Sequence, residues 1–260
     1  MTQTFLITSA RDAHAATATG LPCAFLCYRI GPNGALQRAM FSGSCNGGLL
    51  GIFDAPGLLV ADLEQLSQTI AAECRSKLYA GVLFDFQIQD NAQDAFASLC
   101  TNLQQRSIPV FFPHTMAAAV PKSRVILPGS LSGGTFDEML EQYTTQYALP
   151  QICLDLQRCR HSFTMPSNSP DGQPLMPQEL QALLQQYQPK VFFSPELCTN
   201  YFTYRPPDQP FRFVLFDDPD TAAQRLRRAT DYGVRSCFLL YSEWGSDAKH
   251  IVTTALFAEK

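Results

Sequence analysis

The sequence predicts an α/β protein in which a single domain, residues 1–260, folds as a (β/α)8 TIM barrel. Short apolar runs alternate with amphipathic helical patterns along the whole chain, which is typical of βα units around a parallel sheet. The length of 260 residues lies in the usual range of one such barrel. No linker rich in proline and glycine divides the chain. An open, doubly wound sheet is the alternative that the same pattern leaves open.

Eight apolar runs are the predicted barrel strands. They are rich in the branched and aromatic residues that strands favour, and turn-forming residues separate them. In chain order they are Phe5–Thr8, Ala24–Ile30, Leu49–Phe53, Gly81–Phe86, Val110–Phe112, Gln151–Leu154, Val191–Phe193 and Cys237–Tyr241. The residues Pro32, Asn33 and Gly34 predict a hairpin turn that pairs the second run with Leu36–Phe41.

Five helices are predicted between these runs: Asp62–Lys77, Asp90–Arg106, Phe136–Tyr147, Pro177–Tyr187 and Asp220–Tyr232. The last of them has clear end signals. Asp218 and Pro219 precede it, a carboxylate that can cap the first turn and a proline suited to that turn. Gly233 follows its last residue, where a left-handed conformation commonly ends a helix.

The composition excludes several functional classes. Hydrophobic residues make up 46% and charged residues 16% of the chain, so we expect a well-packed core and no intrinsic disorder. The 19 basic and 23 acidic residues give a net charge of −4 without a basic cluster. We therefore expect neither a nucleic-acid partner nor binding to an anionic membrane. Complete P-loop, dinucleotide and zinc motifs are absent from the sequence, so we expect no cofactor and no metal.

The cysteines and the first residues predict the compartment. Nine cysteines are an odd number and contain no C-x-x-C pair, which indicates reduced thiols in the cytoplasm. The start of the chain has no basic segment followed by an apolar core, so it does not resemble a signal peptide. Export by a route that the sequence does not show is the alternative. The sequence does not predict the oligomeric state.

The fourth predicted strand carries the first candidate site. Side chains alternate along a strand, so Leu83, Asp85 and Gln87 share one face. In TIM barrels the functional residues lie at the C-terminal ends of the strands. If this face is the barrel interior, Asp85 and Gln87 are candidate catalytic residues. An aspartate that only caps the following loop is the alternative.

The ends of the fifth and sixth predicted strands supply further polar side chains. Asp155 ends the sixth run and is a candidate catalytic residue, and Arg158 and His161 follow it as candidate ligand contacts. His114 follows the fifth run and is a candidate contact as well. An Asp–Arg pair that fixes the loop is the structural alternative. A composite metal site of Asp85, His114 and His161 is a weaker alternative.

The last two predicted strands are followed by carboxylates and aromatic residues. Glu196 follows the seventh run as a candidate catalytic group, and Glu243 and Trp244 follow the eighth as candidate ligand contacts. Tyr201 and Tyr204 belong to an aromatic loop that could cover the same end of the barrel. Aromatic rings can stack on the apolar face of a sugar. The alternatives are a loop carboxylate for Glu196 and packing against the barrel end for Trp244.

Three segments resemble the glycoside hydrolase family 18 chitinases. The segment AGVLFDFQ (Ala80–Gln87) resembles the D-G-x-D-x-D-x-E strand of that family. The segment LFDDPDTAAQRLRRATDY (Leu215–Tyr232), followed by Gly233, is similar to the family's acidic D-D-P-x-S segment, helix and glycine before the last strand. The segment ICLD (Ile152–Asp155) resembles the M-x-Y-D motif of strand six. Their order fits over most of the chain, and the resemblance implies a TIM barrel.

The resemblance also implies where this chain departs from the family. Gln87 stands at the position of the glutamate that acts as general acid, whereas Asp85 keeps the position of the aspartate that orients the substrate's acetamido group. In this family the N-acetyl group of the substrate attacks the anomeric carbon. A glutamine amide donates hydrogen bonds but supplies no proton to a leaving group. Leu154 takes the position of the motif tyrosine, and Leu240 that of the last-strand tryptophan.

We therefore expect a glycoside-hydrolase-like barrel without the family's hydrolytic activity. It would bind a carbohydrate of the N-acetylglucosamine type in the cleft at the C-terminal ends of the strands. Whether the chain is an enzyme stays open. One alternative is an active glycosidase with relocated carboxylates, and the other is a non-catalytic interaction scaffold. The relocated carboxylates would be Asp85, Asp155, Glu196 and Glu243.

Overall fold

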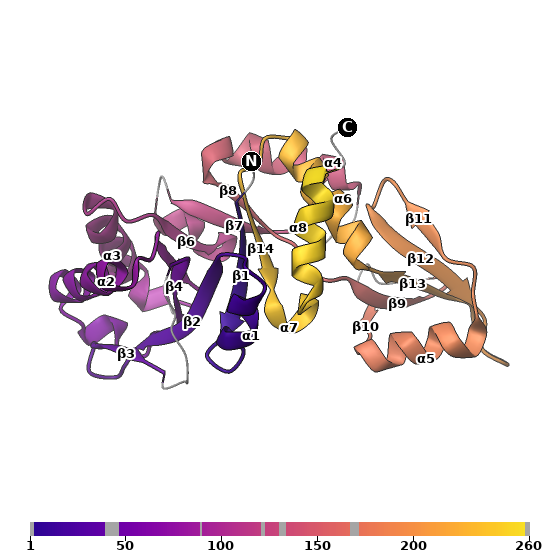
Figure 1. The fold of residues 1–260 in the computed structure, drawn as a ribbon, viewed down its shortest axis with the longest axis horizontal. Coiled ribbons are helices and arrows are strands. Elements are labelled where there is room, and N and C mark those ends of the chain that lie inside the picture. Colours follow the sequence, from indigo (N-terminus) through magenta and orange to yellow (C-terminus); the bar gives the residue numbers. More distant parts are fainter. Residues whose placement is uncertain are drawn as a thin grey trace.

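The computed structural model describes residues 3–39, 47–88, 90–120, 123–129, 134–166 and 172–257. Eight parallel strands form a closed barrel (Figure 1). They are β1 (Gln3–Ser9), β2 (Cys23–Ile30), β4 (Leu49–Asp54), β5 (Val82–Phe84), β6 (Val110–Pro113), β7 (Arg124–Pro128), β8 (Ile152–Asp155) and β14 (Ser236–Leu240). Strand β1 pairs with β14 on one side and with β2 on the other, which closes the sheet. The predicted (β/α)8 barrel is confirmed, and the open sheet is excluded.

The barrel interior is filled by one apolar layer to which every strand contributes. Rings from three strands meet in this layer, and the centroid of Phe5 lies 5.5 Å from that of Phe238 and 5.9 Å from that of Phe111. Such a layer makes the barrel a packed core and leaves only its ends for a ligand. The layer consists of Phe5, Ala24, Leu49, Leu83, Phe111, Ile126, Cys153 and Phe238.

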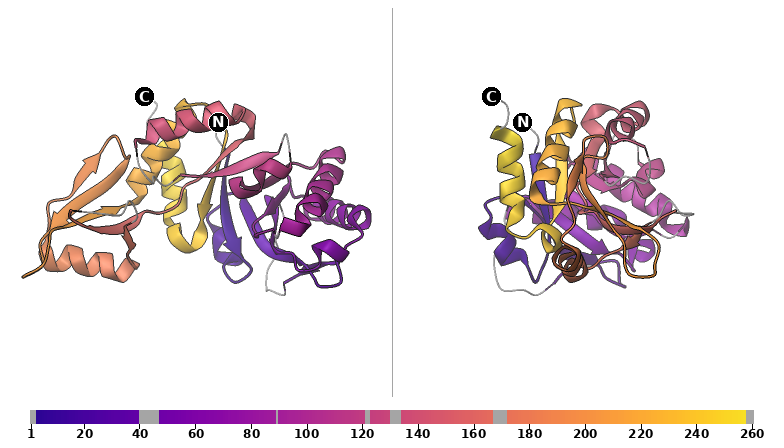
Figure 2. Two further views of the ribbon diagram at one scale, coloured as in Figure 1. Left: turned by 180° about the vertical axis from the view of Figure 1, so that it is seen from behind. Right: turned by 90° about the vertical axis from the view of Figure 1, so that its right-hand side faces the viewer.

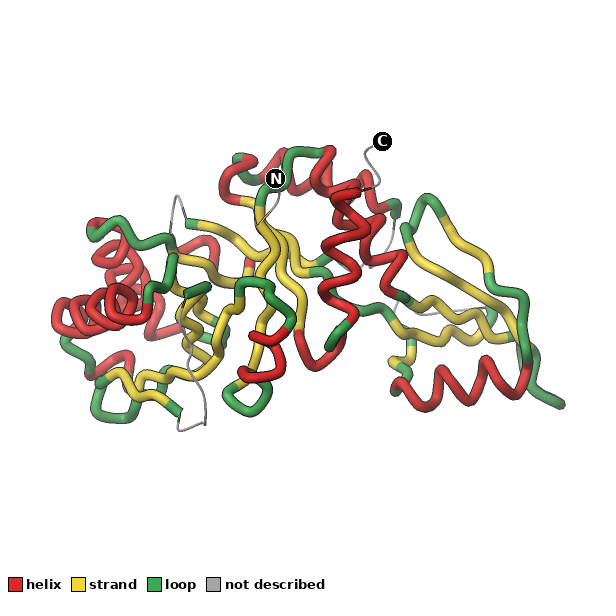
Figure 3. The backbone as a smooth tube through the Cα atoms, viewed as in Figure 1, coloured by secondary structure: helices red, strands yellow, loops and turns green. Residues whose placement is uncertain are grey.

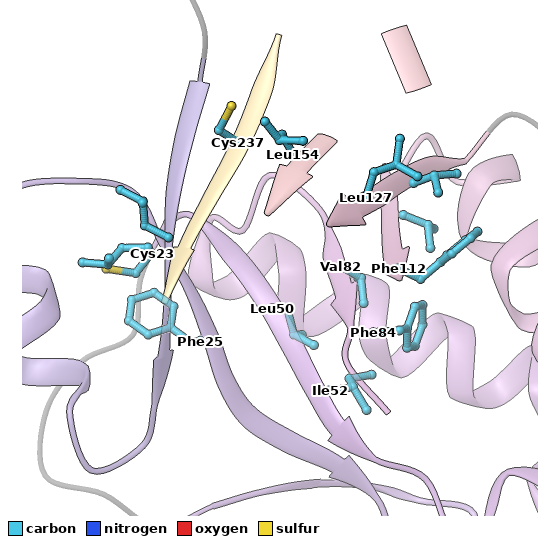
Figure 4. Close-up of a cluster of buried hydrophobic side chains, with 14 of the residues drawn as sticks. Cys23, Phe25, Leu50, Ile52, Val82, Phe84, Phe112, Leu127, Leu154 and Cys237 are labelled. Carbon is cyan, nitrogen blue, oxygen red and sulfur yellow. The ribbon is translucent and has the colours of Figure 1, made fainter. Parts of the chain in front are cut away.

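The outward-facing side chains of the strands form a second core beneath the surrounding helices (Figure 4). Val82 and Phe84, for example, flank the inward Leu83 and point outward, as the alternation along a strand requires. Around the barrel lie α1 (Ala13–Ala18), α2 (Leu63–Lys77), α3 (Gln93–Gln105), α4 (Phe136–Gln146), α6 (Pro219–Asp231), α7 (Tyr241–Trp244) and α8 (Asp247–Phe257). Short 3-10 helices are η1 (Leu58–Val60), η2 (Asp90–Ala92), η3 (His114–Ala119) and η4 (Leu149–Gln151).

The five helices that the sequence predicts are all present (Figure 3). Their starts follow from capping: the side chain of Asp62 accepts a hydrogen bond from the Gln65 amide, and that of Asp218 accepts one from the Thr221 amide. The predicted hairpin is also present, because β3 (Leu36–Arg38) pairs antiparallel with β2. Residues 40 and 41 of its predicted second strand lie outside the described residues. No helix among the described residues is both long and apolar enough to cross a membrane.

Two of the predicted strands occupy other places than expected. The sixth barrel strand is β7, which the sequence analysis missed, so β8 is the seventh strand. The assignment of Ile152–Asp155 to the strand-six motif is therefore wrong, and so is the equation of Leu154 with the motif tyrosine. The run at Val191–Phe193 is not a barrel strand, because it forms the edge strand β11 of a second sheet. Short apolar runs do not reveal which sheet they join.

The second sheet is inserted between β8 and α6 and extends to one side of the barrel (Figure 2). It is antiparallel, with the strand order β10-β9-β13-β12-β11. Helix α5 (Pro177–Tyr187) covers one face through three leucines that pack on Phe202, Val214 and Phe216. The strands are β9 (Arg160–Thr164), β10 (Gln173–Pro174), β11 (Phe192–Ser194), β12 (Thr199–Tyr204) and β13 (Arg212–Phe216).

A buried ion pair joins this insertion to the barrel. Asp217 follows β13 and is 1% exposed, and Arg225 on α6 is 2% exposed. The guanidinium of Arg225 donates to both carboxylate oxygens of Asp217, at 2.8 and 2.9 Å. The same carboxylate accepts from the hydroxyl of Thr199 at 2.6 Å and from the amide of Cys159 at 2.7 Å. The paired geometry and the added hydrogen bonds offset the desolvation of both charges.

Candidate functional site

The candidate site lies at the barrel mouth, defined as the C-terminal ends of the eight barrel strands. Asp85 comes two residues after the interior Leu83, and Asp155 two residues after the interior Cys153. The period of two therefore places both residues in the inward register, one layer above the apolar core. The backbone fixes them there: the Asp85 amide donates to the Ile52 carbonyl at 2.9 Å, and the Gly129 amide to the Asp155 carbonyl at 2.7 Å.

These two carboxyl groups lie in an environment that disfavours their charge. Burial raises the pKa of Asp155 to about 6, and the negative charge of Asp85 contributes to the rise. A hydrogen bond of 3.0 Å from the amide of Gln157 to Asp155 acts in the opposite direction. Burial also raises the pKa of Asp85. Within the described ranges of the chain, neither carboxylate forms an ion pair.

Amide groups lie directly beyond both carboxylates. Gln87 follows Asp85 by two residues, is exposed, and lines a cavity of about 220 Å³ at the ends of β4 and β5. Gln157 follows Asp155 by two residues in the same way. Amides both donate and accept, so they suit the hydroxyl groups of a carbohydrate. The sequence analysis missed Gln157, although the spacing of Asp85 and Gln87 repeated at Asp155 could have indicated it.

Two further predicted residues lie at the expected end of the barrel. Leu240 is the last residue of β14 and comes two residues after the interior Phe238. It is 38% exposed, so it presents an apolar surface at the mouth. His114 begins η3 directly after β6 and is exposed. Among the described residues, no three His, Cys, Asp or Glu side chains are placed to hold a metal ion.

The residues that follow β14 pack against the barrel end. Trp244 is 2% exposed, and its indole N–H donates to the Leu156 carbonyl at 2.9 Å. The guanidinium of Arg158 lies 4.7 Å from the Trp244 ring centroid and donates to the Glu243 carbonyl at 2.9 Å. The carboxylate of Glu243 is paired with Arg160. The prediction that Trp244 stacks on a sugar is therefore wrong, because its ring is buried.

The other predicted contacts belong to the insertion. Glu196 lies in the turn between β11 and β12 and not after a barrel strand, and its carbonyl accepts from the Phe136 amide of α4 at 2.9 Å. His161 lies on β9, with its Nδ1 3.4 Å from the sulfur of Cys159. The expectation that these two side chains border the mouth after the sixth and seventh barrel strands is corrected by the strand order.

Tyr201 and Tyr204 are on strand β12 and not on a loop. The alternation along β12 sends them to opposite faces of the inserted sheet. Tyr201 stacks on Phe192, with ring centroids 5.5 Å apart. Tyr204 lies on the α5 face, where its ring centroid is 4.5 Å from that of Tyr187. The two rings therefore do not act together on one ligand.

The comparison with known proteins rests on structure. No protein-family model and no curated protein sequence matches the chain. Among solved structures, the spore cortex-lytic enzyme SleL of Bacillus cereus is similar, with a TM-score of 0.68 and 12% identity over 98% of this chain and 74% of that one. A glycoside hydrolase family 18 chitinase of Cycas revoluta has a TM-score of 0.64 and 11% identity over 97% and 98% of the two chains. A class V chitinase of tobacco has a TM-score of 0.65 and 8% identity over 99% and 100%.

These neighbours define the class of fold. The chain is a TIM barrel of the kind found in glycoside hydrolase family 18 chitinases and chitinase-like proteins. The Cycas and tobacco structures are of variants in which a glutamate is changed to glutamine, and each contains a tetramer of N-acetylglucosamine. The resemblance that three short segments of the sequence carry is thus confirmed at the level of the fold.

Proposed function

We propose that this chain binds a carbohydrate of the N-acetylglucosamine type at its barrel mouth and lacks the hydrolytic activity of the chitinases that it resembles. The observation that carries the proposal is the position of Asp85 and Gln87. Both follow the end of β5: Asp85 continues the inward register of Leu83, and Gln87 lines a cavity at the ends of β4 and β5. The structural neighbours of this barrel include glutamine variants with a bound N-acetylglucosamine tetramer.

The absence of hydrolysis follows from the chemistry of Gln87. By the family resemblance, this residue takes the position of the general acid. An amide has no proton to transfer to the departing glycosidic oxygen, and the loss of a positioned acid lowers a rate by about 10²–10⁴-fold. The same amide donates and accepts hydrogen bonds, so the loss of proton transfer leaves sugar binding intact.

A second candidate function is a glycosidase in which Asp155 is the acid. The observation that favours it is the pKa of Asp155, which burial raises to about 6, a value suited to a general acid near neutral pH. Asp85 would then be the partner carboxylate. Glu243 is a weaker acid candidate because Arg160 pairs with it, and Glu196 because it lies on the insertion. The third candidate function is an interaction scaffold without a ligand at the mouth.

Ligand-observed NMR separates the three functions in one experiment. Chitin-type and peptidoglycan-type oligomers of N-acetylglucosamine are incubated with the protein, and spectra are recorded over hours. Saturation transfer without new anomeric signals supports the proposed binding protein. New anomeric signals contradict it and favour the glycosidase, in which case Asp155→Asn is the variant to compare. If neither saturation transfer nor a new anomeric signal is observed, the interaction scaffold is the remaining function.

A matched pair of variants shows whether the mouth is the binding site. Asp85→Asn removes the charge at the end of β5, and Asp94→Asn removes an exposed carboxylate on the first turn of α3. The proposal expects weaker saturation transfer for Asp85→Asn and an unchanged signal for Asp94→Asn. Equal signals for both variants would place the ligand elsewhere.

A further inference from the structure

The cavity beside Gln87 is larger than the acetyl group of a chitin oligomer requires. It has a volume of about 220 Å³ and lies between the segments that follow β4 and β5. A water molecule occupies about 30 Å³ in the liquid, and the methyl group of an acetyl is of similar size. An N-acetylglucosamine unit that contacts Gln87 would therefore leave most of the cavity unfilled.

The walls of this cavity are apolar and are held by the core. Leu58 and Ala92 are buried parts of the lining and belong to the outer core beneath the helices. Phe86 and Ile88 are half-buried and pack against the same core. The ring of Phe86 makes an edge contact with that of Phe96, with the centroids 5.9 Å apart. A preformed apolar surface of this kind favours an apolar group that displaces water from it.

The lining has two polar side chains, and the charged one is already paired. One carboxylate oxygen of Asp54 accepts a hydrogen bond from the Ala55 amide at 2.9 Å, and the other lies 3.6 Å from the Arg29 guanidinium. The second polar side chain is that of Gln87, which is exposed. Its amide donates and accepts hydrogen bonds at once, as the amide of an N-acyl group does. The lining thus combines one amide with apolar walls and favours a neutral ligand group.

We propose that this cavity binds the chain of an N-acyl group longer than acetyl, on the sugar unit that contacts Gln87. The inference rests on the proposed function, because it names the substituent of the glycan that the same mouth binds. The amide of the acyl group pairs with the amide of Gln87, and the acyl chain displaces water from Leu58, Phe86 and Ile88. The ligand class is then a chitin-type oligomer that carries a short fatty N-acyl chain.

The test compares derivatives of the N-acetylglucosamine tetramer by isothermal titration calorimetry. The probes are the unmodified tetramer, tetramers in which an N-butanoyl group replaces the acetyl at one end or the other, and the butyl glycoside of the unmodified tetramer. We expect at least one N-butanoyl tetramer to bind about tenfold more tightly than the unmodified one, because each buried methylene group contributes about fourfold. We expect no such gain for the butyl glycoside, because its chain is attached without an amide.

Three variants show whether the gain in affinity comes from this cavity. Ala55→Phe fills the cavity, and Leu59→Asn makes an exposed part of its lining polar, so both variants should abolish the gain. Val60→Asn is the matched control, because Val60 is an exposed residue of the same 3-10 helix that lies outside the lining. This variant should retain the gain. Thermal unfolding of each variant confirms that it is folded.

The outcomes distinguish this inference from the function on which it rests. Binding of the unmodified tetramer without a gain for either N-butanoyl tetramer overturns the inference and leaves the proposed function intact. Binding of none of the probes overturns both. A gain that the butyl glycoside matches overturns the inference, because the chain would not enter through the amide. A gain that Ala55→Phe retains overturns it as well, because the chain would lie outside the cavity.

Discussion

Carboxylates have opposite surroundings at the joint of the insertion and at the barrel mouth. At the joint, Asp217 receives both arms of Arg225, the hydroxyl of Thr199 and the amide of Cys159. At the mouth, neither Asp85 nor Asp155 forms an ion pair with a described side chain, and desolvation raises the pKa of both. The first arrangement stabilises a structure, whereas the second leaves charge uncompensated in a place where a ligand can reach it. Perturbed groups of the second kind are typical of functional sites.

The largest effect is expected from restoring the acid at the mouth. Gln87→Glu places a carboxyl group where the resemblance implies a general acid, so hydrolysis of the N-acetylglucosamine tetramer should increase by about 10²–10⁴-fold over the wild-type protein. The measurement is the release of reducing ends over time. Gln157→Glu is the matched control, because it adds a carboxyl group two residues after Asp155. Equal rates in both variants would contradict the assignment of position 87.

Removing the charge of Asp217 at the joint should lower the free energy of unfolding. Asp217→Asn leaves Arg225 buried without its partner, and breaking such a pair costs about 3–5 kcal/mol. Denaturant titration measures the loss in the free energy of unfolding. Asp220→Asn, an exposed position on α6, should change it by less than about 1 kcal/mol. Similar losses at the two positions would show that burial of the pair is not the cause.

Removing the charge of Asp155 at the mouth should raise the free energy of unfolding, whereas removing that of Asp217 lowers it. Burial raises the pKa of Asp155 from 3.8 to about 6, so the folded state holds this proton more tightly than the unfolded state. The Asp155 contribution to stability is then complete below about pH 4 and is lost as the pH rises through about 6. Asp155→Asn should therefore raise stability at pH 7 by about 1–3 kcal/mol. The difference in unfolding free energy from the wild-type protein, followed between pH 4 and 7, checks this; a constant difference contradicts it.

The smallest effect is expected at Glu243. Its ion pair with Arg160 is partly exposed, and such pairs contribute about 0.2–1 kcal/mol. Glu243→Gln should lower stability by that amount and leave glycan binding unchanged in the NMR experiment. A loss of binding in this variant would show that the segment after β14 contacts the ligand after all.

The sequence predicts most of the fold because its local signals agree with one another. The capping residues Asp62 and Asp218 place two helix starts within a residue, and Pro177–Tyr187 matches α5 in full. It misplaces elements where the signal is only a short apolar run. The sequence analysis misses strand β7, whose residues RVILP begin with an arginine and end with a proline. It also assigns the residues FFS of β11 to the wrong sheet.

The residues of the candidate site show the same difference between local signals, which the sequence reveals, and contacts with distant segments, which it does not. Asp85, Gln87 and Asp155 could be predicted, because alternation along a strand and the position of its C-terminal end are local properties. The burial of Trp244 could not, since it depends on the chain segment around Leu156, 88 residues away in sequence. The roles of Glu196 and Tyr204 depend likewise on a second sheet that the sequence analysis did not foresee.

The insertion leaves the barrel and returns to it at adjacent points. The Asp217 amide donates to the Cys159 carbonyl at 2.9 Å, and the Cys159 amide donates to the Asp217 carboxylate at 2.7 Å. Chain segments that end so close together can be exchanged as a unit, because a short bridge replaces them without moving what lies outside. Residues 160–216 therefore form a segment that can be replaced as one unit. A barrel that retains Asp217 and Arg225 keeps their ion pair, and a grafted module must replace the Thr199 hydroxyl that also donates to Asp217.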